Sequence, residues 1–438
     1  MRPIVAIIGR PNVGKSTLFN RFVGKRLAIV HDEPGVTRDR HYADAHIAGR
    51  DVVVVDTGGF DPDSDDPMRM GIARHVQAAI AEADVVLCVL DTTASVPADQ
   101  QAVDLLRRSD KPVLYLANKA DTAELEAASS TLYELGVPEL FAVSGLHGRG
   151  LADVEVALGK VLPPPEPAPA PRDDGLTRVA LLGRPNAGKS SLFNRLSGGE
   201  KSLVDSRPGT TRDPIDSLVE HGGRRFVLVD TAGVRRRSKV DEGVEAASVL
   251  RAIRSIERAE VVVLLVDASE GIAEQDARLL GLCVDRMRAV IIGMNKMDEL
   301  TPKQQKEVLA DARHATRFAG FAPVLGLSAK TGKGVGALVE HVARAAEQFK
   351  KRVPTAELNR FFEQVLAERP PPTRGGRAPR IYYVTQVQTS PPVFAAMSNA
   401  PANIDKSYKR FVTNQLRKAF GFEAVPLLVH YRKKKRDA

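Results

Sequence analysis

The chain has 438 residues and a formal net charge of +9, and its 43% hydrophobic and 27% charged residues are typical of a globular protein with two or three domains. No apolar run approaches the roughly 20 residues that span a bilayer, and polar residues from Gly9 onward argue against a secretory signal. We therefore expect a cytoplasmic protein without a membrane contact. The cysteines, Cys88 and Cys283, lie among aliphatic residues, which predicts buried thiols, no disulfide partner and no zinc site.

An internal repeat dominates the sequence. Residues 9–20 read GRPNVGKSTLFN and residues 183–194 read GRPNAGKSSLFN, an offset of 174 that also relates Asp56 to Asp230. The offset has grown to 177 where Asn118 matches Asn295. A repeat of this length indicates that one whole domain is present twice.

Each copy contains short, continuous aliphatic runs separated by longer stretches with helical spacing. Such runs are typical of strands buried on both faces, so we expect an α/β fold with a mostly parallel sheet and helices on both faces. The predicted strands are 4–8, 52–55, 85–90, 113–117 and 140–143 in the first copy, and 179–182, 226–229, 261–266, 289–294 and 324–327 in the second.

The rest of the chain divides into a linker and a different module. Residues 163–177 are proline-rich, which predicts an extended tether between domains at 1–162 and 178–347. In the C-terminal module, residues 348–438, we expect an α/β arrangement. Its predicted elements are a helix at 355–368, a loop at 369–380, strands at 381–388 and 393–397, a helix at 405–420 and a strand at 427–431.

Positive charge is concentrated in the C-terminal module. Residues 351–438 hold 17 Lys and Arg and 6 Asp and Glu, or 17 − 6 = +11, which leaves 9 − 11 = −2 for the first 350 residues. Aromatic residues are interleaved with these cations, as in Tyr408-Lys409-Arg410-Phe411. Most of the aromatic residues are expected in the core, whereas the cations predict a polyanionic partner. A membrane surface is disfavoured, because the helix at 405–420 has few bulky apolar residues beyond one face.

Both repeats contain a phosphate-binding loop. Residues 9–16 and 183–190 fit GxxxxGK[ST] between a predicted strand and a predicted helix. Backbone amides and the helix N-terminus would face the phosphates, with Lys15 or Lys189 reaching the β and γ phosphates. The hydroxyls of Ser16 and Ser190 are candidate Mg²⁺ ligands.

Selection of guanine is predicted from a second motif. Asn118-Lys119-Ala120-Asp121 and Asn295-Lys296-Met297-Asp298 each follow a predicted strand. The carboxylate of Asp121 or Asp298 would accept the N1 hydrogen and the 2-amino group of guanine. Adenine offers no such pair of donors, and an unpaired carboxylate facing it is penalised.

Two further segments would sense the γ-phosphate. Asp56 and Asp230 are expected to hold Mg²⁺ through water, and the amides of Gly59 and Gly233 to contact the terminal phosphate. The hydroxyls of Thr37 and Thr211 would ligate Mg²⁺ in the GTP state, and both segments would be released after hydrolysis.

These motifs resemble those of the translation-factor-related small GTPases, and two such domains followed by a C-terminal module resemble the Der (EngA) family of bacterial ribosome-assembly GTPases over essentially the whole chain. The resemblance implies hydrolysis of GTP to GDP and phosphate, a role in assembly of the large ribosomal subunit, contact with rRNA, and a KH-like C-terminal domain. It also implies that Ser144-Gly145-Leu146 and Ser328-Ala329-Lys330 contact guanine through backbone groups, although Gly145 and Leu146 depart from the usual Ser-Ala-Lys. We expect a monomer. The expected nucleotide ligands are Gly9, Arg10, Pro11, Asn12, Val13, Gly14, Lys15, Ser16, Thr17, Thr37, Asp56, Gly59, Asn118, Lys119, Asp121 and Ser144 in the first domain, and Gly183, Arg184, Pro185, Asn186, Ala187, Gly188, Lys189, Ser190, Ser191, Thr211, Asp230, Gly233, Asn295, Lys296, Asp298, Ser328, Ala329 and Lys330 in the second.

How hydrolysis is accelerated stays open. Phe60 and Val234 stand where Ras-like proteins carry a water-positioning glutamine, so slow intrinsic turnover is favoured over a hidden arginine finger. In similar GTPases an asparagine at the place of Asn12 and Asn186 helps to coordinate K⁺, which makes potassium activation a further hypothesis.

The segments that follow Phe60 and Val234 carry opposite charge. Residues 61–66 contain four aspartates, whereas residues 235–239 read RRRSK. Charge runs of this kind are often simply solvated. The alternative is that the acidic segment docks on the basic module in one nucleotide state, while the basic segment meets RNA or that acidic segment.

The KH-like module has no Gly-x-x-Gly clamp, because Gly375 and Gly376 are adjacent. Recognition of RNA shape and backbone is therefore expected instead of single-strand clamping. Another hypothesis is a GTPase module of an RNA-modifying or signalling complex with a protein partner. The duplicated GTPase domain and basic module favour ribosome assembly.

Overall fold

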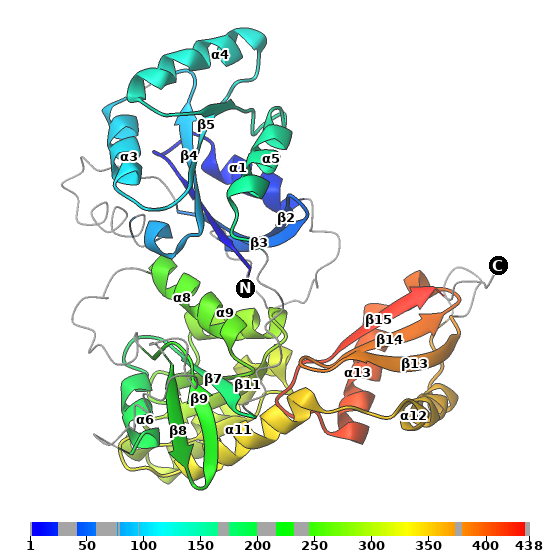
Figure 1. Cartoon of the computed structure of the whole chain (residues 1–438). Coiled ribbons are helices and arrows are strands. Elements are labelled where there is room, and N and C mark those ends of the chain that lie inside the picture. The colour runs from blue at the N-terminus through cyan, green and yellow to red at the C-terminus, as the bar shows by residue number, and fades with distance from the viewer. Residues whose placement is uncertain are drawn as a thin grey trace. The chain divides into compact units, whose positions relative to one another are not determined.

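The computed structural model describes residues 2–24, 42–57, 77, 79–94, 96–164, 175–198, 216–231, 245–372 and 379–433. The structure comprises two units, Met1–Pro171 with Ser238–Arg254, and Arg172–Arg237 with Ser255–Ala438. Figure 1 follows the chain through them by colour.

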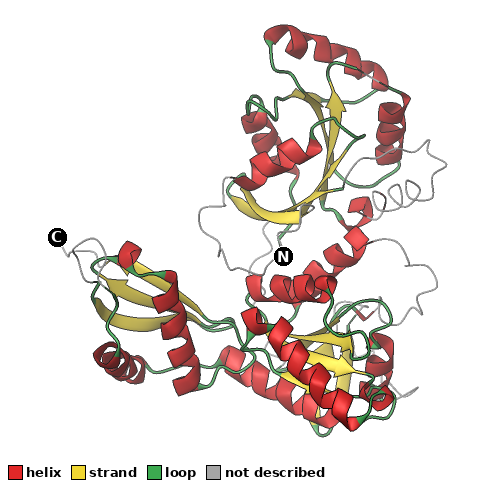
Figure 2. Cartoon of the chain, turned by 180° about the vertical axis from the view of Figure 1, so that it is seen from behind, coloured by secondary structure: helices red, strands yellow, loops and turns green. Residues whose placement is uncertain are grey.

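The first copy of the repeat forms a six-stranded sheet in the order β2-β3-β1-β4-β5-β6. All neighbouring strands are parallel except β2, which runs antiparallel to β3. The central strands β1 and β4 are buried along their whole length, because helices cover both faces of the sheet (Figure 2). The strands are β1 Ile4–Ile8, β2 Tyr42–Ile47, β3 Arg50–Asp56, β4 Val85–Asp91, β5 Val113–Asn118 and β6 Leu140–Ala142, and the helices are α1 Lys15–Gly24, α3 Pro97–Arg107, α4 Ala123–Ala128, η1 Ser129–Leu135 and α5 Leu151–Val161.

The second copy repeats this topology in the order β12-β11-β10-β7-β9-β8, again with one antiparallel pair, β8 and β9. Its core combines aliphatic residues of the strands with one face of α11, whose buried positions recur at helical spacing from Val335 to Phe349. The strands are β7 Thr177–Leu182, β8 Ser217–His221, β9 Arg224–Leu228, β10 Val261–Asp267, β11 Ala289–Asn295 and β12 Val324–Gly326, and the helices are α6 Lys189–Leu196, α8 Glu245–Arg258, α9 Glu274–Asp285, η2 Met297–Glu299, α10 Pro302–Ala315, η3 Arg317–Ala319 and α11 Val335–Lys350.

The ten strands predicted from aliphatic runs are confirmed, with ends that differ by one or two residues. Among the strands in the described ranges of the two copies, β2 and β8 were not predicted. Both strands are only partly buried, so polar residues interrupt their apolar pattern, as in Tyr42–Ile47 with the sequence YADAHI.

The C-terminal module contains a three-stranded sheet in the order β13-β14-β15, in which β13 is antiparallel and β15 parallel to β14. Helices α12 and α13 pack on this sheet around a core that includes Phe362, Phe394, Tyr408 and Leu416. The predicted helices and strands are confirmed, whereas residues 373–378 of the predicted loop lie outside the described residues. Asp405 is the N-cap of α13, and its carboxylate accepts from the Tyr408 N–H. The elements are α12 Thr355–Glu368, β13 Ile381–Gln388, β14 Val393–Ser398, η4 Pro401–Asn403, α13 Lys406–Phe420 and β15 Leu428–Lys433.

The segment after α13 contacts the second copy of the repeat. The Ala424 N–H donates to the Phe321 carbonyl at 2.9 Å, and the Ala424 carbonyl accepts from the Val290 N–H at 2.7 Å. The guanidinium of Arg417 donates to the carbonyls of Phe422 and Val425 and lies 4.7 Å from the centroid of the Phe321 ring. Burial lowers the pKa of Arg417 to about 10.

None of the helices in the described ranges combines the length and apolar character that crossing a membrane requires. The thiols of Cys88 and Cys283 are both buried, as predicted, and both are free. Burial raises the pKa of Cys88 to about 12, so this thiol stays protonated at neutral pH.

Candidate nucleotide-binding sites

The predicted phosphate loops connect the first strand of each sheet to the following helix, β1 to α1 and β7 to α6. Gly14 and Gly188 have φ values of 93° and 94°, a left-handed conformation in which a side chain is strained. A Cβ at either position would also collide with the amide of Asn118 or Asn295. These two glycines are therefore required by the backbone of the loop.

Lys15 and Lys189 begin helices α1 and α6 and fold back over their own loops. Lys15 Nζ donates to the Arg10 carbonyl at 2.7 Å, and Lys189 Nζ donates to the carbonyls of Gly183 and Arg184 at 2.7 and 2.6 Å. Burial lowers the pKa of each ammonium group to about 8. A phosphate anion would stabilise the charged form and raise this pKa.

One asparagine in each domain joins the phosphate loop to the predicted base-contacting loop. Asn118 is buried; its Nδ2 donates to the Val13 carbonyl at 2.7 Å, and its Oδ1 accepts from the Gly145 N–H at 2.9 Å. Asn295 does the same with the Ala187 carbonyl at 2.8 Å and the Ala329 N–H at 2.9 Å. The asparagine thus holds two loops that come from distant parts of the sequence.

The aspartates predicted to read guanine are oriented by serines. The Ser144 hydroxyl donates to Asp121 Oδ1 at 2.5 Å. In the second domain, a hydrogen bond from Ser328 lowers the pKa of Asp298 below its ordinary value. Each carboxylate therefore lies beside the base-contacting loop of its own domain, next to the serine that begins that loop.

The two base-contacting loops, residues 144–149 and 328–333, have the same backbone hydrogen bonds despite different sequences. The Ser144 N–H donates to the Arg149 carbonyl at 3.1 Å, and the Ser328 N–H donates to the Lys333 carbonyl at 2.9 Å. The N–H three residues after each serine donates to that serine's hydroxyl at 3.0 Å. The departure from Ser-Ala-Lys at residues 145 and 146 therefore leaves the backbone of the loop unchanged.

The predicted Mg²⁺ ligands are brought together in the first domain. The Ser16 hydroxyl donates to Asp56 Oδ2 at 2.6 Å, so a hydroxyl and a carboxylate oxygen, both suited to Mg²⁺, lie side by side. In the second domain, Asp230 Oδ2 instead accepts from the Ser255 hydroxyl of α8 at 2.7 Å. The two pockets differ at this position.

Several predicted ligands lie outside the described residues. These are Thr37, Gly59, Thr211 and Gly233, together with Phe60, Val234, the charged segments 61–66 and 235–239, and the Gly375-Gly376 pair of the C-terminal module. Asn12 and Asn186 are described and have φ values of 65° and 63°, a left-handed conformation that asparagine tolerates better than most residues.

Sequence reasoning missed the acidic partners of the site. Arg10 and Arg184 of the phosphate loops donate from Nε to buried carboxylates, Asp99 at 3.3 Å and Asp276 at 2.9 Å. Burial raises the pKa of both carboxyl groups, against the influence of their hydrogen bonds and the arginines. The repeat contained a signal for them, because the offset of 177 that relates Asn118 to Asn295 also relates Asp99 to Asp276.

A second missed pair involves the lysine of the guanine motif. Lys119 Nζ donates to Asp91 Oδ2 at 2.7 Å, and Lys296 pairs with Asp267 in the same way. Burial alone would raise the pKa of Asp91, but hydrogen bonds from Lys119 and Thr93 outweigh it and lower the pKa. This ion pair fixes the aliphatic part of the lysine next to the pocket.

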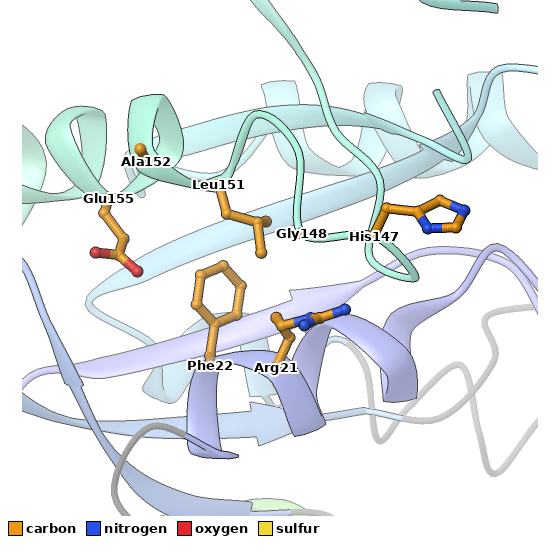
Figure 3. A pocket seen from close by; sticks show the side chains of 7 residues that line it. All are labelled: Arg21, Phe22, His147, Gly148, Leu151, Ala152 and Glu155. Atoms are coloured by element: carbon orange, nitrogen blue, oxygen red, sulfur yellow. The ribbon is translucent and has the colours of Figure 1, made fainter. Parts of the chain in front are cut away.

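A cavity of about 320 Å³ lies between α1 and α5 of the first domain. Figure 3 shows Arg21 and Phe22 on the α1 side and the loop with His147 and Gly148 on the other. None of the residues that line it is a predicted nucleotide ligand. Its lining residues are Arg21, Phe22, His147, Gly148, Leu151, Ala152 and Glu155.

Family models match all three parts of the chain. A model described as a 50S ribosome-binding GTPase matches residues 4–119 and again 178–296. A KH-domain-like model of EngA bacterial GTPase enzymes matches residues 352–432, and an elongation factor Tu GTP-binding domain model matches residues 245–348.

Curated relatives cover the whole chain. GTPase Der from Geotalea uraniireducens is 43% identical over 430 residues, which are 98% of this chain and 97% of the relative. GTPase Der from Salinispora arenicola is 45% identical over 436 residues, 99% of this chain and 93% of the relative. Among solved structures, Era from Aquifex aeolicus bound to GDP and AlF4⁻ matches with 22% identity and a TM-score of 0.32, over 64% of this chain and 99% of that one. With two guanine-nucleotide pockets and a KH-like module in one polypeptide, the chain belongs to the Der (EngA) family of tandem GTPases and is a GTP-binding and GTP-hydrolysing protein.

Proposed function

We propose that this GTPase acts in assembly of the large ribosomal subunit. In this proposal the C-terminal module contacts rRNA, and the nucleotides bound in the two pockets determine the arrangement of the domains. The observation that carries the proposal is the combination of two GTPase domains with a KH-like module whose net charge is 17 − 6 = +11 over residues 351–438. The proposed domain limits are 1–162, 163–177, 178–347 and 348–438.

Several cations of this module are exposed to solvent, where a polyanion can reach them. Arg417 and Lys351 are used internally, since both donate to backbone carbonyls. Lys409 and Arg410 are exposed on α13, and Arg432 is exposed on β15. Lys409 Nζ lies 5.5 Å from the centroid of the Tyr431 ring, which supports its position without consuming its charge. Such clusters favour salt-sensitive contact with phosphates, in agreement with recognition of RNA shape and backbone.

In each pocket we propose that the described residues bind and orient the nucleotide. Lys15 and Lys189 would neutralise the β and γ phosphates, and Asp121 and Asp298 would accept the N1 hydrogen and 2-amino group of guanine. Ser16 and Asp56, or Ser190 and Asp230, would hold Mg²⁺, which when bound neutralises phosphate charge and favours attack by water.

We further propose that K⁺ accelerates hydrolysis. The left-handed backbone at Asn12 and Asn186 gives asparagine a conformational role there in addition to any role as a K⁺ ligand. The test is single-turnover hydrolysis with K⁺ replaced by Na⁺ at constant ionic strength. A rate that does not change on this replacement would remove potassium from the account.

Co-sedimentation with purified ribosomal subunits tests the ribosomal proposal. The full chain should pellet with large subunits to a different extent with a non-hydrolysable GTP analogue than with GDP. The double substitution Lys409→Glu and Arg410→Glu should weaken this association. The control Lys303→Glu removes a side chain of the second GTPase domain that is 88% exposed and should have no effect. Association with a protein partner but with neither ribosomal subunit would favour an RNA-modifying or signalling complex instead.

A further inference from the structure

In each domain, an arginine near the end of the helix that follows the phosphate loop donates hydrogen bonds to the base-contacting loop. In the last turn of α1, Arg21 donates from Nε to the Gly145 carbonyl at 3.2 Å and from Nη2 to the Leu146 carbonyl. In α6, Arg195 donates from Nε to the Ala329 carbonyl at 3.2 Å and from Nη2 to the Lys330 carbonyl. The same fork is therefore formed in both domains, although the loop sequences differ. Figure 3 shows Arg21 extending toward the loop that carries His147.

The fork determines which way the peptide groups of the loop face. In a trans peptide, the carbonyl and the N–H of one plane point in opposite directions. When Arg21 binds the Gly145 carbonyl, the N–H of Leu146 must point away from α1. Two neighbouring N–H groups are already occupied, since that of Gly145 donates to Asn118 Oδ1 and that of His147 donates to the Ser144 hydroxyl at 3.0 Å.

The N–H groups of Leu146 and Lys330 differ from these neighbours in their hydrogen bonding. Within the described ranges, neither takes part in a hydrogen bond of the protein. A donor in this position suits the guanine O6, a carbonyl acceptor on the same edge of the base as the groups read by Asp121 or Asp298. This step rests on the proposed contact between the loop and guanine.

The position of the arginine along the helix adds a second constraint. Lys15 and Arg21 are six residues apart on α1, which corresponds to about 9 Å along the helix axis. One end of the helix therefore carries the phosphate-binding lysine, and the other end holds the loop that meets the base. A planar guanidinium can donate to two carbonyls at once in a fixed geometry, whereas an ammonium group acts as a point donor.

We propose that Arg21 and Arg195 are positioning residues for guanine recognition. Each holds the peptide plane of its base-contacting loop so that the N–H of residue 146 or 330 faces the base O6, and each fixes that donor relative to the phosphate site on the same helix. Neither arginine contacts the nucleotide.

The test compares three diphosphates in the full-length chain. Arg21→Lys is measured in an Asp298→Asn background, in which the second pocket no longer selects guanine, and Arg195→Lys is measured in an Asp121→Asn background. The ligands are GDP, IDP, which lacks the 2-amino group, and 2-aminopurine riboside diphosphate, which lacks O6 and with it the N1 hydrogen. Their equilibrium affinities are obtained by calorimetry or competition.

The proposal predicts that either substitution lowers affinity for GDP and IDP equally, by about tenfold, the weight of one hydrogen bond of roughly 1.4 kcal/mol. Affinity for the ligand without O6 should stay within about twofold of the background, because that ligand never used the donor. The control is Arg107→Lys, since Arg107 also donates to two loop carbonyls, Leu135 at 2.6 Å and Gly136 at 2.8 Å, without reaching the base-contacting loop. It should leave all three affinities unchanged.

Three results would overturn the positioning role. They are an equal loss of affinity for all three ligands, no loss of affinity for any of them, or a selective loss that Arg107→Lys reproduces. A different outcome bears on the base contact itself. If the backgrounds without the arginine substitution bind the ligand lacking O6 as tightly as IDP, the loop does not read O6, and the proposed contact fails before the arginines are tested.

Discussion

Asn118→Ala should lower the free energy of unfolding of the first domain by more than the small size of the deleted side chain suggests. The buried side chain satisfies two backbone groups at once, the Val13 carbonyl at 2.7 Å and the Gly145 N–H at 2.9 Å. Removing it leaves both groups without their partner in the interior, and a buried group left in this way costs about 1–3 kcal/mol. Allowing for some access of water, we expect a loss of about 2–4 kcal/mol in the free energy of unfolding of this domain.

The assay is calorimetry of the nucleotide-free chain combined with hydrogen exchange. A domain of this size loses roughly 2–4 °C in melting temperature per kcal/mol, so the transition of the first domain should fall by roughly 5–15 °C. Exchange should accelerate at the Gly145 amide and around the phosphate loop. Asn295→Ala should produce the same effects in the second domain only, since it forms the matching bonds with Ala187 and Ala329.

The control is Ser130→Ala, which removes an exposed hydroxyl that donates to the Ala127 carbonyl at 2.9 Å, and it should shift neither transition by more than a degree or two. A drop no larger than that of this control, or faster exchange spread evenly through both domains after Asn118→Ala, would refute the view that the asparagine ties the two loops together.

Three further predictions concern other groups of the chain. The lysines at the phosphate sites have a pKa of about 8 in the free protein, and bound phosphates raise this pKa. Nucleotide binding above pH 8 therefore takes up a proton, and nucleotide affinity should fall about tenfold per site from pH 7 to pH 9. An affinity that calorimetry finds unchanged over this pH range would contradict the linkage. Arg10→Ala should destabilise the first domain by about 3–5 kcal/mol, because the buried carboxylate of Asp99 loses its cation, and Arg10→Ala combined with Asp99→Leu should recover most of the loss in denaturant unfolding. Arg417→Ala should leave the Val425 carbonyl without its donor and the Phe422 carbonyl with only the Val425 N–H at 3.4 Å, so hydrogen exchange at 421–425 should become faster. Lys418→Ala, an exposed neighbour, is the control, and equal protection in both variants would count against this anchoring role.

Much of the fold could be predicted because buried parallel strands leave an unmistakable aliphatic pattern. Val85–Asp91 and Val261–Asp267 are buried on every residue, and each is apolar up to its final aspartate. Strands β2 and β8 could not be recognised in this way, since they are only partly buried and carry polar residues such as Asp44 and Glu220 at positions that are not buried.

The site was predictable where a motif reports the chemistry, and less so where side chains support it. The phosphate loops and the guanine motif follow from residue types that phosphates and guanine require. The partners Asp99 and Asp91, and the forks of Arg21 and Arg195, depend on which elements meet in space, which local spacing does not encode. Comparing the two copies further along the repeat would have drawn attention to Arg21 and Arg195, because the offset of 174 relates them as well.

The central claim is that each of the two pockets of one chain recognises the guanine edge through an aspartate. Substitution of one aspartate at a time tests this claim most directly. Xanthine carries an oxygen where guanine has its 2-amino group, so an asparagine amide complements it better than a carboxylate does. Titration of each variant with guanine, xanthine and adenine nucleotides should find one guanine and one xanthine nucleotide per chain for Asp121→Asn, and likewise for Asp298→Asn, while ATP binds neither. A variant that still holds two guanine nucleotides, or displacement of GTP by ATP, would contradict the account.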